Sequence, residues 1–218
     1  NIIKIRRELN EELNDKEKSE VDTWERDPKA VAATDHYFGK GIEHITHMLP
    51  DTMDKSETHK KVEKHLGKEL SHDEYKSGKT LDKYGRESKF GGYIKEEKLR
   101  QEFANDTTRQ GTKFTGLKVK VTRHPHDVAG QTSEGQSWED ESCKNFKDGV
   151  NKGFLKHEVK HGTVVAYLQD HTGKDIARST LQPHYNSNGH VAYDVNSHYG
   201  INHEGFHNKV RQIASDIS

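Results

Sequence analysis

The shortage of apolar residues constrains the fold of this chain more than any other feature. Hydrophobic residues make up only 29% of its 218 residues, whereas soluble domains reach about 45–50% on a count that includes glycine. The combined share of Leu, Ile, Val and Phe is about 20% of the residues. Below that share, disorder is suspected when the net charge is also high. The net charge is only −1, so we expect a folded chain whose small core depends on packing against other protein subunits.

The same composition excludes several classes of protein. No apolar run approaches the ~18 residues of a membrane span, and there is no net basic charge to hold nucleic acid. The single cysteine, Cys143, excludes an internal disulfide and suits a reducing compartment. The first residues do not form a signal peptide, because Arg6 and Arg7 follow Ile5 at once. The start at Asn1 is compatible with proteolytic processing or with a fragment.

The first 110 residues are expected to form a charged helical region. They carry 46 charged side chains, against 25 in residues 111–218. Short helices with thin apolar stripes are marginal alone, so we expect them to pack on another chain. The helix signals are the stripe Ile2, Ile5, Leu9 and Leu13; Asp27-Pro28 through Gly39; Ile42, Ile45 and Leu49 before Pro50; Ser56 through Gly67; Ser71 with Glu74; and Glu96 through Phe103.

Residues 111–218 carry the signals of an antiparallel meander. Strands are predicted at 114–122, 163–168, 176–181 and 191–195, with turns at 171–174 and 186–189. A further helix is predicted at 138–146. Phe206, Val210, Ile213 and Ile217 share one face of a closing helix. The fold class is therefore α+β, with a charged helical region at 1–110 and a small antiparallel-sheet domain at 111–218, closed by a C-terminal helix.

One motif matches that of zinc proteases. The run His157-Glu158-Val159-Lys160-His161 has the H-E-x-x-H pattern, in which two histidines bind zinc and the glutamate acts as general base. With 16 histidines and 20 glutamates, such a match arises by chance in about one chain in ten. Gly153 and Gly162 also leave room for only a short helix. The alternative is a polar segment that leads into a strand.

Two further motifs have simple structural alternatives. Cys143 could be a nucleophile with His184 or His190 as base, but Asp140 and Glu141 precede it and raise a thiol pKa. The alternative is a small apolar side chain. Ser77-Gly78-Lys79-Thr80 contains the end of a phosphate-binding loop without the earlier glycine or strand, so a polar turn is predicted.

Histidines and basic residues are concentrated in one stretch. Lys118, Lys120, Arg123, His124 and His126 could contact phosphate, but no aromatic residues alternate with them, which favours a solvated face. His124 and His126 are a possible metal-ligand pair, with loop histidines as the alternative. Ten of the 16 histidines follow residue 110, so the surface charge should depend strongly on pH.

The second half of the chain carries a set of distinctive motifs. They are Arg123-His-Pro-His-Asp-Val-Ala-Gly-Gln131, Ser137-Trp-Glu-Asp-Glu-Ser-Cys143-Lys-Asn145, Leu155 through Leu168 with Gly162-Thr-Val-Val-Ala-Tyr-Leu168, and Tyr199-Gly200. Together these motifs resemble a group of poorly characterised tailed-bacteriophage proteins. The similarity covers about residues 110–218, and in the first half is limited to short segments at 35–39 and 84–86. The resemblance implies a virion protein, and the group has no established chemistry to transfer to particular residues.

Three functional hypotheses follow. The first is a phage virion structural protein, made in the host cytoplasm, associated with the capsid and acting by protein–protein assembly. The second is a zinc- or cysteine-dependent hydrolase that acts during infection, and the third is a co-packaged DNA-associated protein. The first is preferred, with no membrane contact, no cofactor, and no assigned catalytic or metal-binding residue.

Overall fold

The computed structural model describes residues 13–82, 84–106, 112–133, 136–147, 151–188 and 190–218. The chain divides into two compact units. The sheet unit comprises the described residues up to Pro50 together with Gly116–Ser218, and the insert unit comprises Asp51–Thr115. These bounds differ from a division at residue 110, because the segment before Pro50 belongs with the C-terminal half. None of the described helices is long and apolar enough to cross a membrane.

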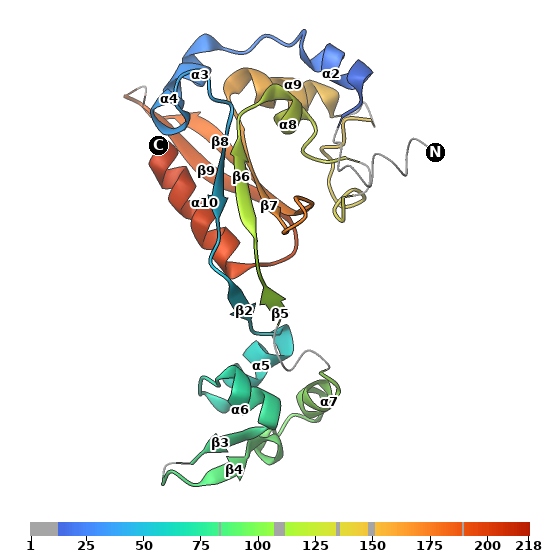
Figure 1. Ribbon diagram of the computed structural model, residues 1–218, viewed down its shortest axis with the longest axis vertical. Helices are drawn as coiled ribbons and strands as arrows, with labels where there is room; N and C mark the ends of the chain where they lie inside the picture. Colours follow the sequence, from blue (N-terminus) through green and yellow to red (C-terminus); the bar gives the residue numbers. More distant parts are fainter. Residues whose placement is uncertain (1–12, 83, 107–111, 134–135, 148–150, 189) are drawn as a thin grey trace. The chain divides into compact units, whose positions relative to one another are not determined.

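The sheet unit contains a five-stranded antiparallel sheet in the order β1-β6-β7-β8-β9 (Figure 1). The last four strands are consecutive in the chain, so the predicted meander and the α+β class are confirmed. The strands are β1 (His44–Met48), β6 (Lys118–Thr122), β7 (Val164–Gln169), β8 (Asp175–Tyr185) and β9 (Val191–Gly200).

The first strand corrects one prediction. Ile42, Ile45 and Leu49 are spaced as in a helix, but residues 44–48 form β1 and pair with β6. Ile45 lies opposite Val121, a fully buried residue of the sheet. The non-local pairing with an apolar strand overrides a local helical spacing. The first half of the chain is therefore mixed, and a helical N-terminal half is not confirmed.

Helices cover both faces of the sheet. The residues Val165 and Tyr167 of β7 belong to a cluster with α2 (Asp15–Val21), α8 (Pro125–Ala129) and α9 (Lys152–His161). Alternate residues of the strand point to the opposite face. There α10 (Glu204–Ile217) packs against β9 and buries the predicted apolar stripe (Figure 1). Covered on both sides, β7 is buried from Val164 to Leu168.

Local signals near the N-terminus correctly predict helix ends. Asp27 accepts a hydrogen bond from the backbone N–H of Lys29 and caps α3 (Pro28–Ala33). A second short helix, α4 (Asp35–Phe38), ends at Gly39 with φ of 90°. Leu13 is buried in the α2–α8–α9 cluster, while the rest of the predicted stripe, Ile2 to Leu9, lies outside the described residues.

The predicted helix at 138–146 is wrong. The segment is a series of turns. The hydroxyl of Ser142 accepts from the backbone N–H of Lys144, and the amide oxygen of Asn145 accepts from that of Lys147. Such side-chain acceptors compete with the helical hydrogen bonds and favour turns.

The insert unit has its own core. Its buried apolar residues are Val62, Leu70, Tyr75, Phe90, Ile94, Leu99 and Phe103. The predicted caps at Ser56 and at Ser71 with Glu74 are confirmed. Its elements are β2 (Thr52–Asp54), α5 (Glu57–Leu66), α6 (His72–Ser77), β3 (Lys79–Leu81), β4 (Glu87–Lys89), η1 (Phe90–Tyr93), α7 (Glu97–Asn105) and β5 (Thr112–Phe114). The strands pair as β2 with β5 and β3 with β4.

A buried histidine in this core makes its stability depend on pH. His59 is 1% exposed and stacks on Tyr75 with ring centroids 4.0 Å apart. Burial lowers the pKa of His59 from 6.5. The unfolded chain therefore binds more protons, and stability present above pH 6.5 is lost as the pH falls through the lower folded pKa. We expect His59→Gln to reduce the loss of unfolding free energy below pH 6.5, measured by urea titration.

The exposed histidine of β1, His44, provides the matched control. His44→Gln should leave the pH dependence of the unfolding free energy unchanged. An equal change in the pH dependence of the unfolding free energy in both variants would show that burial of His59 does not cause the loss of stability at low pH.

A buried polar cluster as the candidate functional site

A polar cluster lies buried on the α8–α9 face of the sheet. The register of β7 and β8 places Arg178 opposite Tyr167 and Thr180 opposite Val165, so both point toward α8 and α9. Described residues between 130 and 133 and between 136 and 147 supply the other side. The polar cluster consists of Gln131, Thr132, Gln136, Ser142, Lys144, Glu158, Arg178, Thr180 and Gln182.

The centre of one half of the cluster is Glu158, which is 2% exposed. Its carboxylate accepts hydrogen bonds from Lys144 Nζ at 2.7 Å, Gln131 Nε2 at 2.6 Å and Gln182 Nε2 at 2.9 Å. A buried carboxylate is stable in its charged form only when it is paired and hydrogen-bonded in this way. Glu158 therefore holds α9, the 130–147 loop and β8 together.

The centre of the other half is Arg178, which is fully buried. Its Nη2 donates to Thr132 Oγ1 at 2.9 Å and to Ser142 Oγ at 2.8 Å. Its guanidinium lies over the ring of Tyr199, 4.6 Å from the centroid. The Nε and Nη1 atoms have no hydrogen-bond partner in the described structure. Burial lowers the pKa of Arg178, as expected for a cation removed from water.

Arg123 shows how this chain satisfies a buried arginine that has a structural role. It is 5% exposed, and all three of its nitrogens donate. Nε reaches the carbonyl of Ile42 at 3.0 Å, and Nη2 that of Gly39 at 3.1 Å. Nη1 reaches Val31 O at 2.7 Å and also pairs with Asp35 at 2.9 Å. Arg123 thus joins the N-terminal helices to the sheet, and Arg178 lacks a comparable set of partners.

The H-E-x-x-H residues lie on α9 but do not converge on one point. His157 and His161 face each other one turn apart, with ring centroids 4.2 Å apart. Burial, His157 and Lys160 lower the pKa of His161. Glu158 points into the polar cluster, where three donors occupy its carboxylate. No group of three or more potential metal ligands occurs in the described parts of the chain. A cavity of about 140 Å³ is lined by His157, Glu158 and His161 together with residues that include Gln182 and Pro183.

The other predicted nucleophile and phosphate motifs are not assembled. Cys143 is exposed, and neither His184 nor His190 contacts it among the described residues. His184 pairs instead with Asp194 at 3.1 Å. In the G-K-T segment a helix ends at Gly78 and a strand follows, which reverses the strand–loop–helix order of a phosphate-binding loop.

Internal contacts also occupy most of the basic stretch. Arg123 is buried, Lys120 pairs with Asp127 at 3.1 Å, and His126 pairs with Asp22 at 2.6 Å. His124 accepts from the backbone N–H of His126 at the start of α8. Burial lowers the pKa of His124. The stretch is therefore not a free basic patch.

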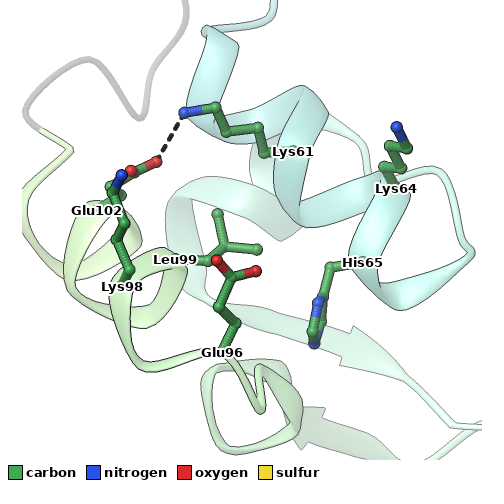
Figure 2. A pocket seen from close by; sticks show the side chains of 7 residues that line it. All are labelled: Lys61, Lys64, His65, Glu96, Lys98, Leu99 and Glu102. Carbon is green, nitrogen blue, oxygen red and sulfur yellow. Dashed lines mark hydrogen bonds and ion pairs between the residues drawn. The ribbon is translucent and has the colours of Figure 1, made fainter.

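A second candidate site is a pocket of about 430 Å³ in the insert unit, between α5 and α7 (Figure 2). Leu99 projects into it, and Lys61 closes one end through an ion pair of 2.9 Å with Glu102. Lys64 and Lys98, also at its edge, have no acidic partner in the portion of the chain described. The remaining lining residues are His65 and Glu96. Its mixture of exposed charges is less specific than the polar cluster.

Sequence reasoning identified Glu158 but missed Arg178. The available signal was a charged residue inside a predicted buried strand, 176–181, where burial requires partners. Gln131 and Gln182 carried no comparable signal, because their role depends on non-local contacts. No protein-family model, curated protein or solved structure matches the chain.

Proposed function

We propose that this chain is a structural protein of a phage particle, made in the host cytoplasm, that binds neighbouring protein subunits at the capsid. The observation that carries the proposal is a set of large apolar side chains left exposed on the two outer strands of the sheet and at the end of β8, which pairs with the outer strand β9. Met48 of β1 is 62% exposed, Val195 of β9 is 44% exposed, and Tyr185 at the end of β8 is 52% exposed.

Outer strands are sites at which another chain can add to a sheet. β1 and β9 are the two ends of the strand order, and β9 is ten residues long. An exposed edge offers backbone donors and acceptors, and alternate apolar side chains add affinity. The phage-like motif set and the shortage of apolar residues for the chain's length support the same proposal.

Glu158 favours this proposal over a zinc hydrolase. Its carboxylate is engaged by Lys144, Gln131 and Gln182, whereas a general base must reach a metal-bound water. The basic stretch, largely occupied by internal contacts, gives little support to DNA binding. Stoichiometric zinc that is lost on His157→Ala would favour the hydrolase, and binding to DNA with a steep salt dependence would favour the third hypothesis.

Mass spectrometry of purified particles, with the copy number of this chain, tests the proposal. We expect a defined number of copies per particle, and we expect Val195→Lys with Met48→Lys to reduce incorporation at least tenfold. A control, Lys209→Ala, changes a partly exposed residue of α10 and should incorporate normally. Absence of the chain from mature particles would contradict the proposal.

A further inference from the structure

Unsatisfied polar atoms are concentrated at one place in the described structure. Six buried side-chain nitrogen or oxygen atoms have no hydrogen-bond partner among the described residues, and five of them belong to the polar cluster. Native proteins leave few such atoms, and an ordered water or a bound ion is a common partner where the protein supplies none. The five are Gln131 Oε1, Gln136 Nε2, Arg178 Nε, Arg178 Nη1 and Thr180 Oγ1.

Arg178 and Gln131 belong to one hydrogen-bonded network. Arg178 contacts the hydroxyls of Thr132 and Ser142, which also bond to each other at 2.8 Å. Ser142 also accepts from the backbone N–H of Lys144, and the Nζ of Lys144 donates to Glu158. The Nε2 of Gln131 donates to the same carboxylate at 2.6 Å. Thr180 lies on the same face of β8 as Arg178. The two free nitrogens of Arg178, Nε and Nη1, are donors. A group that completes the network therefore has to be mainly an acceptor.

The charge of the cluster points to the same chemistry. Arg178 and Lys144 are cations, and Glu158 is the only carboxylate in the cluster. Arg178 has no ion-pair partner among the residues that the structure describes, so one positive charge is uncompensated. An unpaired buried charge is strongly unfavourable, and a negatively charged group would remove that cost.

We propose that the polar cluster binds a small oxyanion, the carboxylate or phosphate group of a ligand, at Arg178. Thr132 and Ser142 orient the guanidinium through Nη2, and Nε and Nη1 remain free to donate to the anion. The Lys144–Glu158 pair fixes the loop that carries these hydroxyls. Charge-assisted bonds from arginine to carboxylate or phosphate are among the strongest hydrogen bonds in proteins. This inference is independent of the proposed assembly function.

Thermal unfolding and calorimetric titration of the full chain test the proposal. The probes are inorganic phosphate and citrate, each compared with sodium chloride at the same ionic strength. We expect the Tm to rise and then saturate with one probe but not with chloride, because a ligand that binds only the folded state stabilises it by mass action. Saturation with phosphate would identify a phosphate site, and saturation with citrate would identify a carboxylate site.

Variants at the buried Arg178 and at the partly exposed Arg26 make the test specific. Arg178→Met should abolish the saturable Tm rise and should melt at or above the Tm of the unmodified chain without ligand, because it removes an unpaired charge. If Arg178→Met fails to fold, Arg178→Lys keeps the charge and should weaken binding at least tenfold. Arg26→Met, at an ion pair with Glu43 in which both side chains are about one quarter exposed, should keep full binding.

Two results would overturn the proposal. One is the absence of a saturable response to either probe by both methods. The other is full binding by Arg178→Lys or Arg178→Met, which would place the anion elsewhere.

Discussion

Arg123→Met is expected to destabilise the sheet unit by about 3–5 kcal/mol, the usual effect of breaking a buried charge network. The guanidinium of Arg123 donates to the carbonyls of Val31, Gly39 and Ile42 and pairs with Asp35. Methionine fills a similar volume but offers no donor. The carbonyls would then be left without this partner, each at a cost of about 1–3 kcal/mol where water cannot replace it.

Urea unfolding followed by circular dichroism measures this effect. Arg26→Met is the matched control, since the Arg26–Glu43 pair is about one quarter exposed on both side chains. A partly exposed pair of this kind is expected to contribute about 1 kcal/mol, much less than the buried network of Arg123. Comparable stability of the two variants would show that the hydrogen bonds of Arg123 do not hold the N-terminal helices to the sheet.

Glu158→Leu is expected to destabilise the chain by about 3–5 kcal/mol, because it removes one partner of a buried ion pair. Lys144 would remain buried, with its side chain 9% exposed in the present structure, and would lose its carboxylate. The amide nitrogens of Gln131 and Gln182 would lose the same acceptor. The effect is measured as the change in the free energy of unfolding.

A double-mutant cycle tests the cause of that loss. Adding Lys144→Met to Glu158→Leu removes the unpaired cation, and we expect recovery of more than half of the lost stability. Glu20→Leu is the control, because Glu20 and Lys152 form an ion pair with both side chains more than one third exposed. Unchanged stability in Glu158→Leu, together with loss of bound zinc, would instead support the H-E-x-x-H interpretation.

The predictable parts of the fold are those that depend on neighbouring residues. Asp27, Ser56 and Ser71 cap helices through hydrogen bonds to backbone groups two or three positions away. The meander is similarly local, because each of its strands pairs with the next. The strand β1 was mistaken for a helix because its partner, β6, lies far along the chain. The bounds of the insert unit depend on the same long-range pairing.

The candidate site was harder to predict for a related reason. The sequence identified Glu158 through a metal motif, but the carboxylate is held by Lys144 and two glutamines from other elements. Arg178 has no motif around it, and its significance lies in the hydrogen bonds that it does not make. Such a property depends on the positions of Thr132, Ser142 and Tyr199, which only the folded chain brings together.

The pairing of β1 with β6 also has a consequence for the order of folding. Met48 pairs with Lys118, so the β1–β6 ladder closes a loop of about 70 residues. Closing this loop costs conformational entropy, which has to be overcome before the strand contacts stabilise the sheet. Within the insert unit, Thr52 pairs with Phe114. If β2 and β5 pair first, only the few residues between β1 and β2 and between β5 and β6 remain to be ordered before β1 can pair with β6. The insert unit would then act as a folding nucleus that recruits β1 to the sheet.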